Sequence, residues 1–155
     1  MTLPASFPLS MSQVNTELGR ATNATTSLLE SATRTLAQKA SGAVAFSDLL
    51  GKATFAASGV NSNISYSSSA NGNADSFPSV NRSGGQSPYT YSWSFTSNPG
   101  AATLLNATLQ TATVRKAFLA GSTGAYSATL QCVVTDNLGN TKTVTGVTAA
   151  ADWAP

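Results

Sequence analysis

Tyr89-Thr90-Tyr91-Ser92-Trp93-Ser94-Phe95 is the stretch that decides the fold class of this chain. Aromatic and small hydroxyl residues alternate along it. Successive side chains of a β-strand point to opposite faces of a sheet, so the pattern gives one aromatic face and one polar face. We therefore predict a half-buried strand with Tyr91 and Trp93 in a core. Tyr89 and Phe95 lie near its ends, where an exposed platform for stacking on sugars is the alternative.

A second alternating segment lies between residues 126 and 134, where every second residue is apolar or aromatic. This period of two predicts another strand, which packs its inner face against Trp93. Residues 135–140, Thr-Asp-Asn-Leu-Gly-Asn, are typical of a tight turn, and residues 141–148 would form the return strand. The inner face of the second strand consists of Tyr126, Ala128, Leu130, Cys132 and Val134.

Weaker strand signals fill the rest of the C-terminal two thirds. Residues 55–68, 104–109 and 111–118 are candidate strands, whereas residues 71–75 and 83–87 are rich in Gly, Asn and Ser and should be loops. About seven short strands separated by turns are typical of an immunoglobulin-like antiparallel β-sandwich. The predicted fold is mainly β, with a short α-helical segment before the sandwich.

Two segments of the predicted sandwich resemble sequence motifs of immunoglobulin-like domains of the polycystic-kidney-disease (PKD) type. The resemblance lies in Tyr91-Ser-Trp93 and in Val134-Thr-Asp-Asn-Leu-Gly-Asn140, and it covers roughly residues 60–150. The usual Phe-Gly-Asp-Gly is replaced here by Phe95-Thr-Ser-Asn-Pro-Gly100, which leaves the subfamily open. The resemblance implies a sandwich that presents a surface, in some cases for weak attachment to host glycans, and implies no enzyme.

The N-terminal residues have a different pattern. Residues 1–10 contain Pro4 and Pro8 and are predicted to form an extended arm. Ser10 and Gln13 have the spacing of a helix capping box, and the apolar residues that follow recur at helical spacing until Gly19.

A second helix is predicted from Ser27, with Glu30 completing another capping box, to Gly42. Ser47 would cap one further turn. Helices this short are marginal in isolation, so their apolar faces must be buried either on this chain or on a neighbouring subunit. We favour the neighbour and predict a docking interface that consists of Met11, Val14, Leu18, Leu28, Leu29 and Leu36.

Three blocks of this helical segment resemble a segment that recurs in structural proteins of tailed-bacteriophage particles. The blocks are Ser12-Gln-Val-Asn-Thr-Glu-Leu-Gly19, Arg34-Thr-Leu-Ala37 and Ser41-Gly-Ala-Val-Ala-Phe-Ser-Asp-Leu-Leu-Gly51. The resemblance covers about a third of the chain. It implies a virion protein that is usually tail-associated, and it names no reaction.

The predicted organisation has four parts. Residues 1–10 are the arm, 11–53 the helical docking segment, 54–148 the sandwich and 149–155 a C-terminal tail. Trp153 stands on a tail of small residues. It is either an anchor into a neighbouring subunit or a cover for the edge of its own domain, and we include it in the predicted docking interface.

Composition narrows the possible partners. Charged residues make up 9% of the chain, and the net charge of +2 comes from scattered side chains, so we expect no nucleic-acid binding. We see no signal peptide, and no apolar run approaches the ~20 residues of a membrane span. We therefore expect a soluble protein that is made in the host cytoplasm, does not insert into membranes and is carried by a particle.

Catalytic chemistry has few candidate groups. The chain has no histidine and one cysteine, Cys132, which excludes a Ser-His-Asp or Cys-His arrangement, a zinc site and an internal disulfide. The acidic residues are far apart in sequence. The oxygen-rich residues 136–140 lack the acid count of an EF-hand, so we interpret them as a turn. We predict no catalytic, metal-binding or cofactor-binding residue.

These patterns predict a non-enzymatic structural protein of a phage virion. Its partners would be other virion proteins, in multiple symmetric copies, first at the tail tip or baseplate and second as a capsid decoration. The alternative from another class is an adhesin module that binds host-surface carbohydrate. An exposed aromatic pair beside Asn and Asp would favour the adhesin, and a packed aromatic face would favour the structural role.

Overall fold

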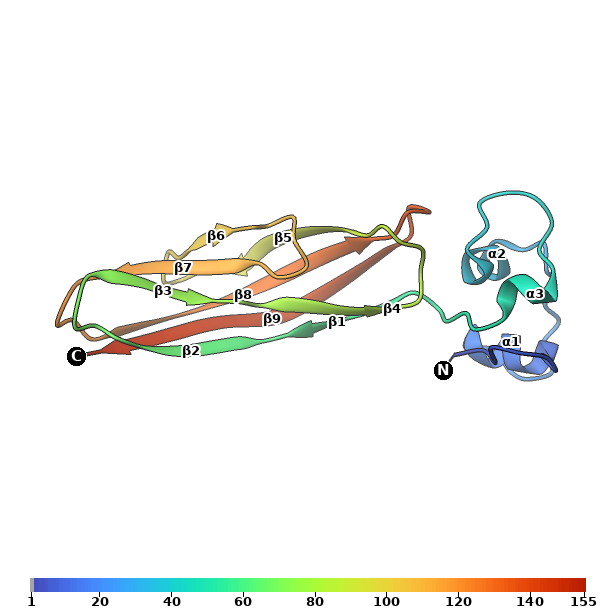
Figure 1. The fold of residues 1–155 in the computed structure, drawn as a ribbon, viewed down its shortest axis with the longest axis horizontal. Coiled ribbons are helices and arrows are strands. Elements are labelled where there is room, and N and C mark those ends of the chain that lie inside the picture. Colours follow the sequence, from blue (N-terminus) through green and yellow to red (C-terminus); the bar gives the residue numbers. More distant parts are fainter. Residues whose placement is uncertain (1) are drawn as a thin grey trace. The chain divides into compact units, whose positions relative to one another are not determined.

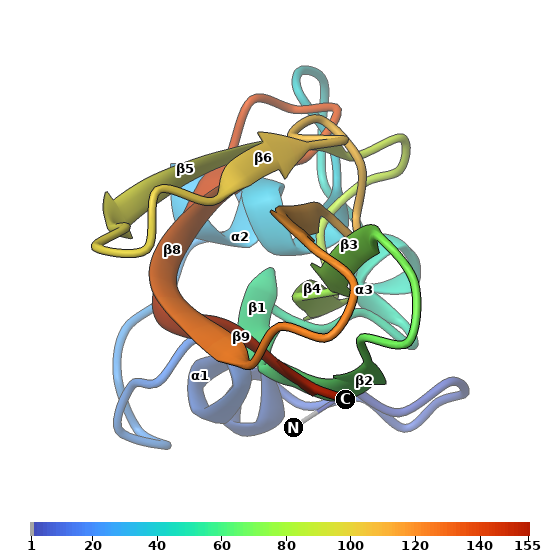
Figure 2. The ribbon, with the colours of Figure 1, turned by 90° about the vertical axis from the view of Figure 1, so that its left-hand side faces the viewer.

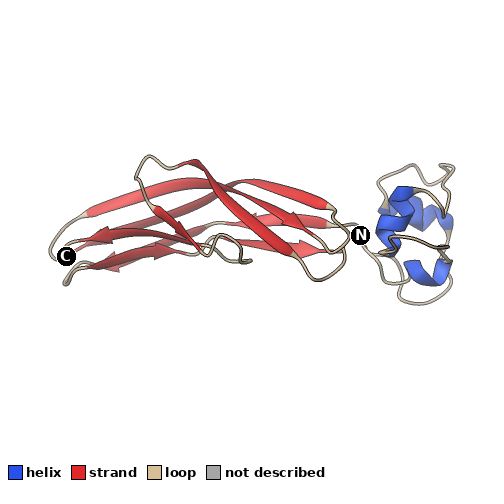
Figure 3. Cartoon of the chain, turned by 90° about the horizontal axis from the view of Figure 1, so that it is seen from above, coloured by secondary structure: helices blue, strands red, loops and turns tan. Residues whose placement is uncertain are grey.

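The computed structural model describes residues 2–155, which form two compact units. The first, here called the helical unit, comprises Met1–Ala56 together with the loops Arg82–Tyr89 and Thr135–Thr141. The second, the sandwich unit, comprises Ala57–Asn81, Thr90–Val134 and Lys142–Pro155. The helices of the described residues lie in the first unit, and almost all of the strand residues lie in the second (Figures 1 and 3).

The helical unit contains α1 (Met11–Glu17), α2 (Ser31–Ala37) and α3 (Phe46–Leu49). The first predicted capping box is confirmed: the Gln13 side chain accepts from the Ser10 backbone N–H at 2.8 Å, and Ser10 Oγ accepts from the Gln13 N–H at 3.4 Å. These bonds satisfy backbone donors that the first turn of a helix leaves unpaired.

The other two predicted caps are wrong. Helix α2 begins at Ser31, and Ser27 Oγ instead accepts from the Leu29 N–H at 3.1 Å, while the Glu30 carboxylate pairs with Arg20 at 2.5 Å. At α3 the first turn is held by Asp48, whose carboxylate accepts from the Ala45 N–H at 2.7 Å. Helix α2 therefore has no side-chain cap at its N-cap residue, Glu30, whereas α3 is capped by an acidic side chain in its first turn.

A small core holds the helical unit together. It is closed at one side by residues 2–10. Leu3 is buried, its N–H donates to the Lys52 carbonyl, and the Gly51 N–H donates to the Pro4 carbonyl, both at 2.8 Å. The predicted extended arm is therefore part of the unit. The buried core residues are Leu3, Val14, Leu36, Ala37, Val44 and Leu49.

The strands follow the three helices along the described part of the chain, and Figure 1 labels them. The loop predicted at residues 71–75 is wrong, because the polar residues there form a strand whose backbone pairs with β7. The strands are β1 (Ala56–Val60), β2 (Ser62–Ser67), β3 (Gly72–Ser76), β4 (Ser79–Ser83), β5 (Thr90–Ser97), β6 (Thr103–Leu105), β7 (Thr113–Phe118), β8 (Gly124–Thr135) and β9 (Thr141–Ala154).

The strand order is that of an immunoglobulin-like sandwich. One sheet has the order β2-β9-β8-β5, and the other layer contains β3-β7-β6 and the pair β1-β4 (Figure 2). The bridge between Ser79 and Thr111 continues the second layer from β4 toward β7. In a seven-stranded immunoglobulin domain, the third strand lies in one sheet with the last two strands, and the other four strands form the second sheet. Here β5 lies in one sheet with the last two strands, β8 and β9. The predicted fold class is confirmed, except that β2 runs parallel to β9.

The predicted sandwich core is largely correct. Leu130, Cys132 and Val134 are fully buried, and Trp93 is 4% exposed, with its indole N–H donating to the Leu109 carbonyl at 2.9 Å. Tyr91 is half-buried. Burial raises the pKa of the Cys132 thiol, which makes it a buried apolar group with little thiolate character.

The predicted C-terminal tail is wrong. Strand β9 continues to Ala154, and Ala149, Ala151 and Trp153 point into the core at alternate positions. Val144 and Val147 are both buried across Gly146, whose φ of +73° shifts the alternation by one residue, as at a β-bulge. The last residues therefore complete the sheet beside β2, with Trp153 opposite Tyr66.

Candidate functional site

Most of the predicted docking residues serve the protein's own cores. Val14 and Leu36 are buried inside the helical unit, and Met11, Leu18 and Leu28 pack against the same core. The apolar faces of these helices are covered within the unit by Leu3 and Leu9 of the N-terminal segment and by Leu49 of α3. This corrects the expectation that a neighbouring subunit would bury them.

Trp153 is likewise unavailable as an anchor into a neighbour. It is 8% exposed, and its indole stacks on Phe118 with ring centroids 5.7 Å apart. Of the two interpretations of this residue, the structure supports the one in which it covers its own domain.

Two polar residues of the first block, Ser12–Gly19, stabilise the fold of the helical unit. Asn15 is 1% exposed, and its side-chain amide donates to the carbonyls of Thr22 at 3.1 Å and Ala24 at 2.8 Å. The buried carboxylate of Glu17 accepts from the backbone N–H of Thr54 at 2.8 Å and from its hydroxyl at 3.0 Å. These two motif residues therefore face inward and hold the unit together, whereas Ser12 and Thr16 of the same block are exposed.

Gln38 is a structural residue that the sequence did not indicate. It ends α2 in the left-handed conformation at a φ of +58°. Its side-chain amide donates to the Gly85 carbonyl, and its amide oxygen accepts from Lys52 Nζ at 2.7 Å. Gln38 thereby connects α2 to the loop 82–89 within the helical unit.

Asp136 organises the loop 135–141 and is 4% exposed. Its carboxylate accepts from the backbone N–H groups of Gln86 at 3.1 Å, Leu138 at 3.0 Å and Asn140 at 2.8 Å. Burial alone would raise the pKa of Asp136, but hydrogen bonds from Asn140, Gln86 and Leu138 outweigh it and lower the pKa. The predicted turn is present, and its oxygens are used within the protein.

Tyr89, a candidate for sugar stacking, has one ring face covered. The Arg82 guanidinium lies 4.0 Å from its ring centroid, an arrangement typical of a cation–π contact. The Phe55 ring lies 5.9 Å away, and the Tyr89 hydroxyl donates to the Gly84 carbonyl at 2.6 Å. The half-buried ring therefore has structural contacts on several sides.

The helical unit also exposes two large apolar side chains. Leu29 is 65% exposed and Phe7 is 61% exposed, although both belong to a unit with its own closed core. Leu29 was among the predicted docking residues, and Phe7 was not, because it lies in the segment interpreted as an arm. Among the predicted docking residues, Leu29 is thus the one that presents an open apolar surface.

A pocket of about 250 Å³ lies within the helical unit, beside α2. Its two cations already have partners: Arg34 donates to the carbonyls of Leu29 and Gly42, and Lys39 donates to Ala43 and pairs with Asp48 at 2.7 Å. The hydrogen bond from Lys39 lowers the pKa of Asp48. The pocket is lined by Ser31, Arg34, Thr35, Lys39, Ala40, Leu138 and Asn140.

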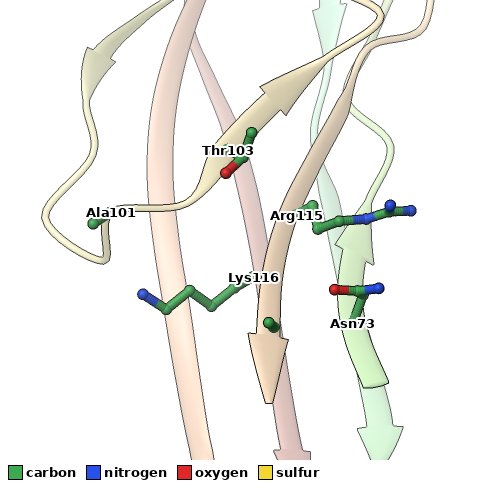
Figure 4. Close-up of a pocket in the computed structure, with 6 residues that line it drawn as sticks. Asn73, Ala101, Thr103, Arg115 and Lys116 are labelled. Atoms are coloured by element: carbon green, nitrogen blue, oxygen red, sulfur yellow. The ribbon is translucent and has the colours of Figure 1, made fainter. Parts of the chain in front are cut away.

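A second pocket, of about 370 Å³, lies on the sandwich unit (Figure 4). Arg115 forms a two-point ion pair with its cross-strand partner Asp75, at 2.7 and 2.6 Å, and Lys116 donates to the Gly100 carbonyl at 2.8 Å. The Asp75 hydrogen bond raises the pKa of Arg115. Figure 4 shows Arg115 and Lys116 extending to opposite sides of β7, so the two cations do not converge on one ligand position.

The described residues, 2–155, contain no group of three or more Cys, Asp or Glu side chains placed to hold a metal ion. Over the same range, none of the helices has the length and apolar character needed to cross a membrane.

Comparisons with known proteins give little further information. No family model matches the chain, and no curated protein matches it. Among solved structures the chain is similar to the M1 domain from titin, with 9% sequence identity over 63% of this chain and 92% of that chain. The TM-score is 0.27, so the fold assignment rests on the strand order described above.

Proposed function

We propose that this protein is a non-enzymatic structural component of a bacteriophage virion, associated with the tail. Its helical unit attaches it to the particle, and the immunoglobulin-like sandwich packs against neighbours or is displayed. Attachment uses apolar side chains that the unit exposes, above all Leu29, while the inward-facing motif residues keep the unit folded.

The observation that carries this proposal is that the helical unit has one set of residues that holds its fold and a separate apolar side chain, Leu29, that is exposed. The three phage-like blocks supply two glycines with positive φ, Gly19 at +70° and Gly51 at +67°, and most of the buried core side chains of the unit, namely Val14, Leu36, Ala37, Val44 and Leu49. Because the inward-facing residues hold the fold, the exposed residues are free to contact a partner. Leu29 exposes most of its side chain, and burying a leucine side chain contributes about 1.5–3 kcal/mol.

The low content of charged residues favours attachment through apolar contacts over attachment through ion pairs. With 9% charged residues, few ion pairs are available to hold a partner, so burial of apolar surface should dominate attachment. The aromatic face of β5 also favours the structural role, because Trp93 is buried and Tyr91 and Phe95 are half-buried.

The experiment is to locate the protein in purified particles of a phage that encodes it. Mass spectrometry of separated heads and tails should find it in the tail fraction at constant stoichiometry, and antibody labelling should decorate the tail. Its absence from washed particles would refute the virion role, and its presence in the head fraction would refute the tail assignment.

A further inference from the structure

The helical unit is built from parts of the chain that are far apart in sequence. The segment Met1–Ala56 supplies its helices, and the loops 82–89 and 135–141 complete it. The first loop leads from β4 to β5, and the second connects β8 and β9, which are neighbours in the four-stranded sheet. Both loops are therefore held at their ends by strands of the sandwich unit.

The two loops are also bonded to each other. The Gln86 N–H donates to the Asp136 carboxylate at 3.1 Å, and the Gln86 carbonyl accepts from the Asn137 N–H at 2.8 Å. Within the first loop, the Tyr89 hydroxyl donates to the Gly84 carbonyl at 2.6 Å. None of these bonds involves a helix, so folding of the sandwich strands is sufficient to bring the loop pair into place.

The helical segment, residues 2–56, fits closely on these loops. The Gln38 side-chain amide donates to the Gly85 carbonyl. A Cβ atom on Gly84 would collide with the backbone carbonyl of Thr54. The end of α2 and the end of the segment therefore both contact backbone groups of the first loop.

The helical segment has little else to keep it folded. Its helices are seven, seven and four residues long, whereas isolated helices shorter than about 12–15 residues are marginal in water. Its own core has six buried side chains, and three of them are no larger than valine. Phe55, a further buried aromatic residue of the segment, packs on Tyr89 of the first loop with ring centroids 5.9 Å apart. The segment thus depends on the loops for part of its packing.

We propose that the sandwich is the folding template of the helical unit, and that the dependence runs in one direction. The sandwich strands position the two loops, and the helical segment folds only on loops that are already in place. Unfolding of the sandwich therefore unfolds the helical unit, whereas unfolding of the helical segment leaves the sandwich intact. One consequence rests on the proposed attachment to the particle: a chain with an unfolded sandwich presents no folded surface around Leu29 and is not incorporated.

Substitution of Gly84 tests the dependence on the loop. Gly84→Ala places a Cβ atom against the Thr54 carbonyl and leaves both apolar cores unchanged. Hydrogen exchange of the α1 and α2 amides should become at least about tenfold faster, because the helical unit opens more readily. The fluorescence of Trp93 and Trp153, which both lie in the sandwich unit, should stay native.

Gly139→Ala is the matched control. Gly139 lies in the second loop with a φ of +81°, and Gly84 has a φ of +61°, so alanine is strained at both positions. No described atom beyond its chain neighbours lies within 4 Å of a Cβ atom at Gly139, so this variant has the strain without the collision. The α1 and α2 amides should exchange near the wild-type rate. Unchanged exchange in the Gly84 variant, or equal acceleration in both variants, would overturn the role of the loop.

Two core substitutions test the direction of the dependence. Leu130→Asp puts a carboxylate in the sandwich core and should unfold the sandwich at urea concentrations at which the wild type is native. Under the same conditions α1 and α2 should lose their exchange protection. Leu36→Asp should unfold the helices and keep the native tryptophan fluorescence.

Two results would overturn the one-way dependence. One is protected α1 and α2 amides in the Leu130 variant after its sandwich has unfolded. The other is an unfolded sandwich in the Leu36 variant. These assays contain no particles, so their failure would leave the proposed attachment through Leu29 untouched, and failure of that attachment would not change the folding results.

Discussion

Trp153 and Phe118 stack face to face in the sandwich unit, with ring centroids 5.7 Å apart and ring planes 18° apart. One residue is near the end of β9 and the other ends β7, so the contact joins the two layers of the sandwich. Gly124 lies against the same indole, where a Cβ atom would collide with the ring. The C-terminal residues are therefore part of the fold.

The first prediction concerns this cluster. Trp153→Ala should destabilise the protein by about 3–5 kcal/mol, the usual cost of truncating a buried large aromatic side chain. Gly124→Ala should also destabilise it, and most of that loss should disappear when Trp153 is already Ala, because the colliding ring is gone. Urea unfolding of the two single variants and the double variant measures the coupling. Additive losses would contradict the packing described here.

The second prediction concerns Asp136 and pH. Its pKa is lowered in the folded protein, so the carboxylate stabilises the fold fully above the ordinary carboxyl pKa, near 4. This contribution is lost as the pH falls through the lower folded-state pKa. Asp136→Ala should cost about 2–4 kcal/mol at neutral pH, because three partly buried backbone N–H groups lose their acceptor. The variant should also lose less stability on acidification.

Asp152→Ala is the control for that experiment, since Asp152 is exposed and accepts from the Ser65 hydroxyl. It should change stability by less than about 0.5 kcal/mol. Urea melts between pH 7 and pH 3 give both comparisons. If the Asp136 variant kept the wild-type acid sensitivity, another group would be responsible for it.

The third prediction separates fold residues from surface residues in the first phage-like block. Asn15→Ala removes two hydrogen bonds to backbone carbonyls and should destabilise the helical unit by about 2–3 kcal/mol. The neighbouring Thr16→Ala changes an exposed side chain and should stay within about 0.5 kcal/mol. Hydrogen exchange of the α1 and α2 amides reports on this unit directly. Equal protection in both variants would mean that the buried amide is dispensable.

The fourth prediction concerns how the protein is held in the particle. Association should survive a wash in about 1 M salt, where the Debye length falls to about 3 Å, because few charged pairs are available to be screened. A separate wash with a metal chelator should also leave it bound. Release by either wash, measured by immunoblot of the pelleted particles, would require ion pairs or a bound cation in place of apolar attachment.

The sandwich could be predicted because its strands alternate clearly. Trp93 and Leu130 belong to two segments, 89–95 and 126–134, in which every second residue is apolar or aromatic. Their burial follows from that period of two. The end of β9 was missed because Ala149 and Ala151 are small, and a run of alanines resembles a linker although the alternate residues are buried. Gly146 further obscured the pattern by shifting the alternation.

The helical unit was harder to predict in detail. The Ser10 capping box has a sequence signature, but the contacts of Gln38 with Gly85 and of Asp136 with Gln86 use backbone groups of distant loops. Every residue has a backbone carbonyl and every residue except proline has a backbone N–H, so the sequence does not indicate which of these groups a distant side chain will bind. The exposed position of Leu29 was equally hidden, because its spacing resembles that of the buried leucines around it.

The most direct test of the proposed virion attachment compares two exposed leucines. Leu29 is 65% exposed on the helical unit, and Leu119 is 71% exposed on the sandwich unit. Each is changed to Ser, folding is verified by circular dichroism, and incorporation into particles is measured by quantitative immunoblot against a major virion protein. Leu29→Ser should reduce incorporation about tenfold or more, for a lost burial of 1.5–3 kcal/mol, while Leu119→Ser should incorporate normally. Normal incorporation of the Leu29 variant, or an equal loss from the Leu119 variant, would contradict attachment through the helical unit.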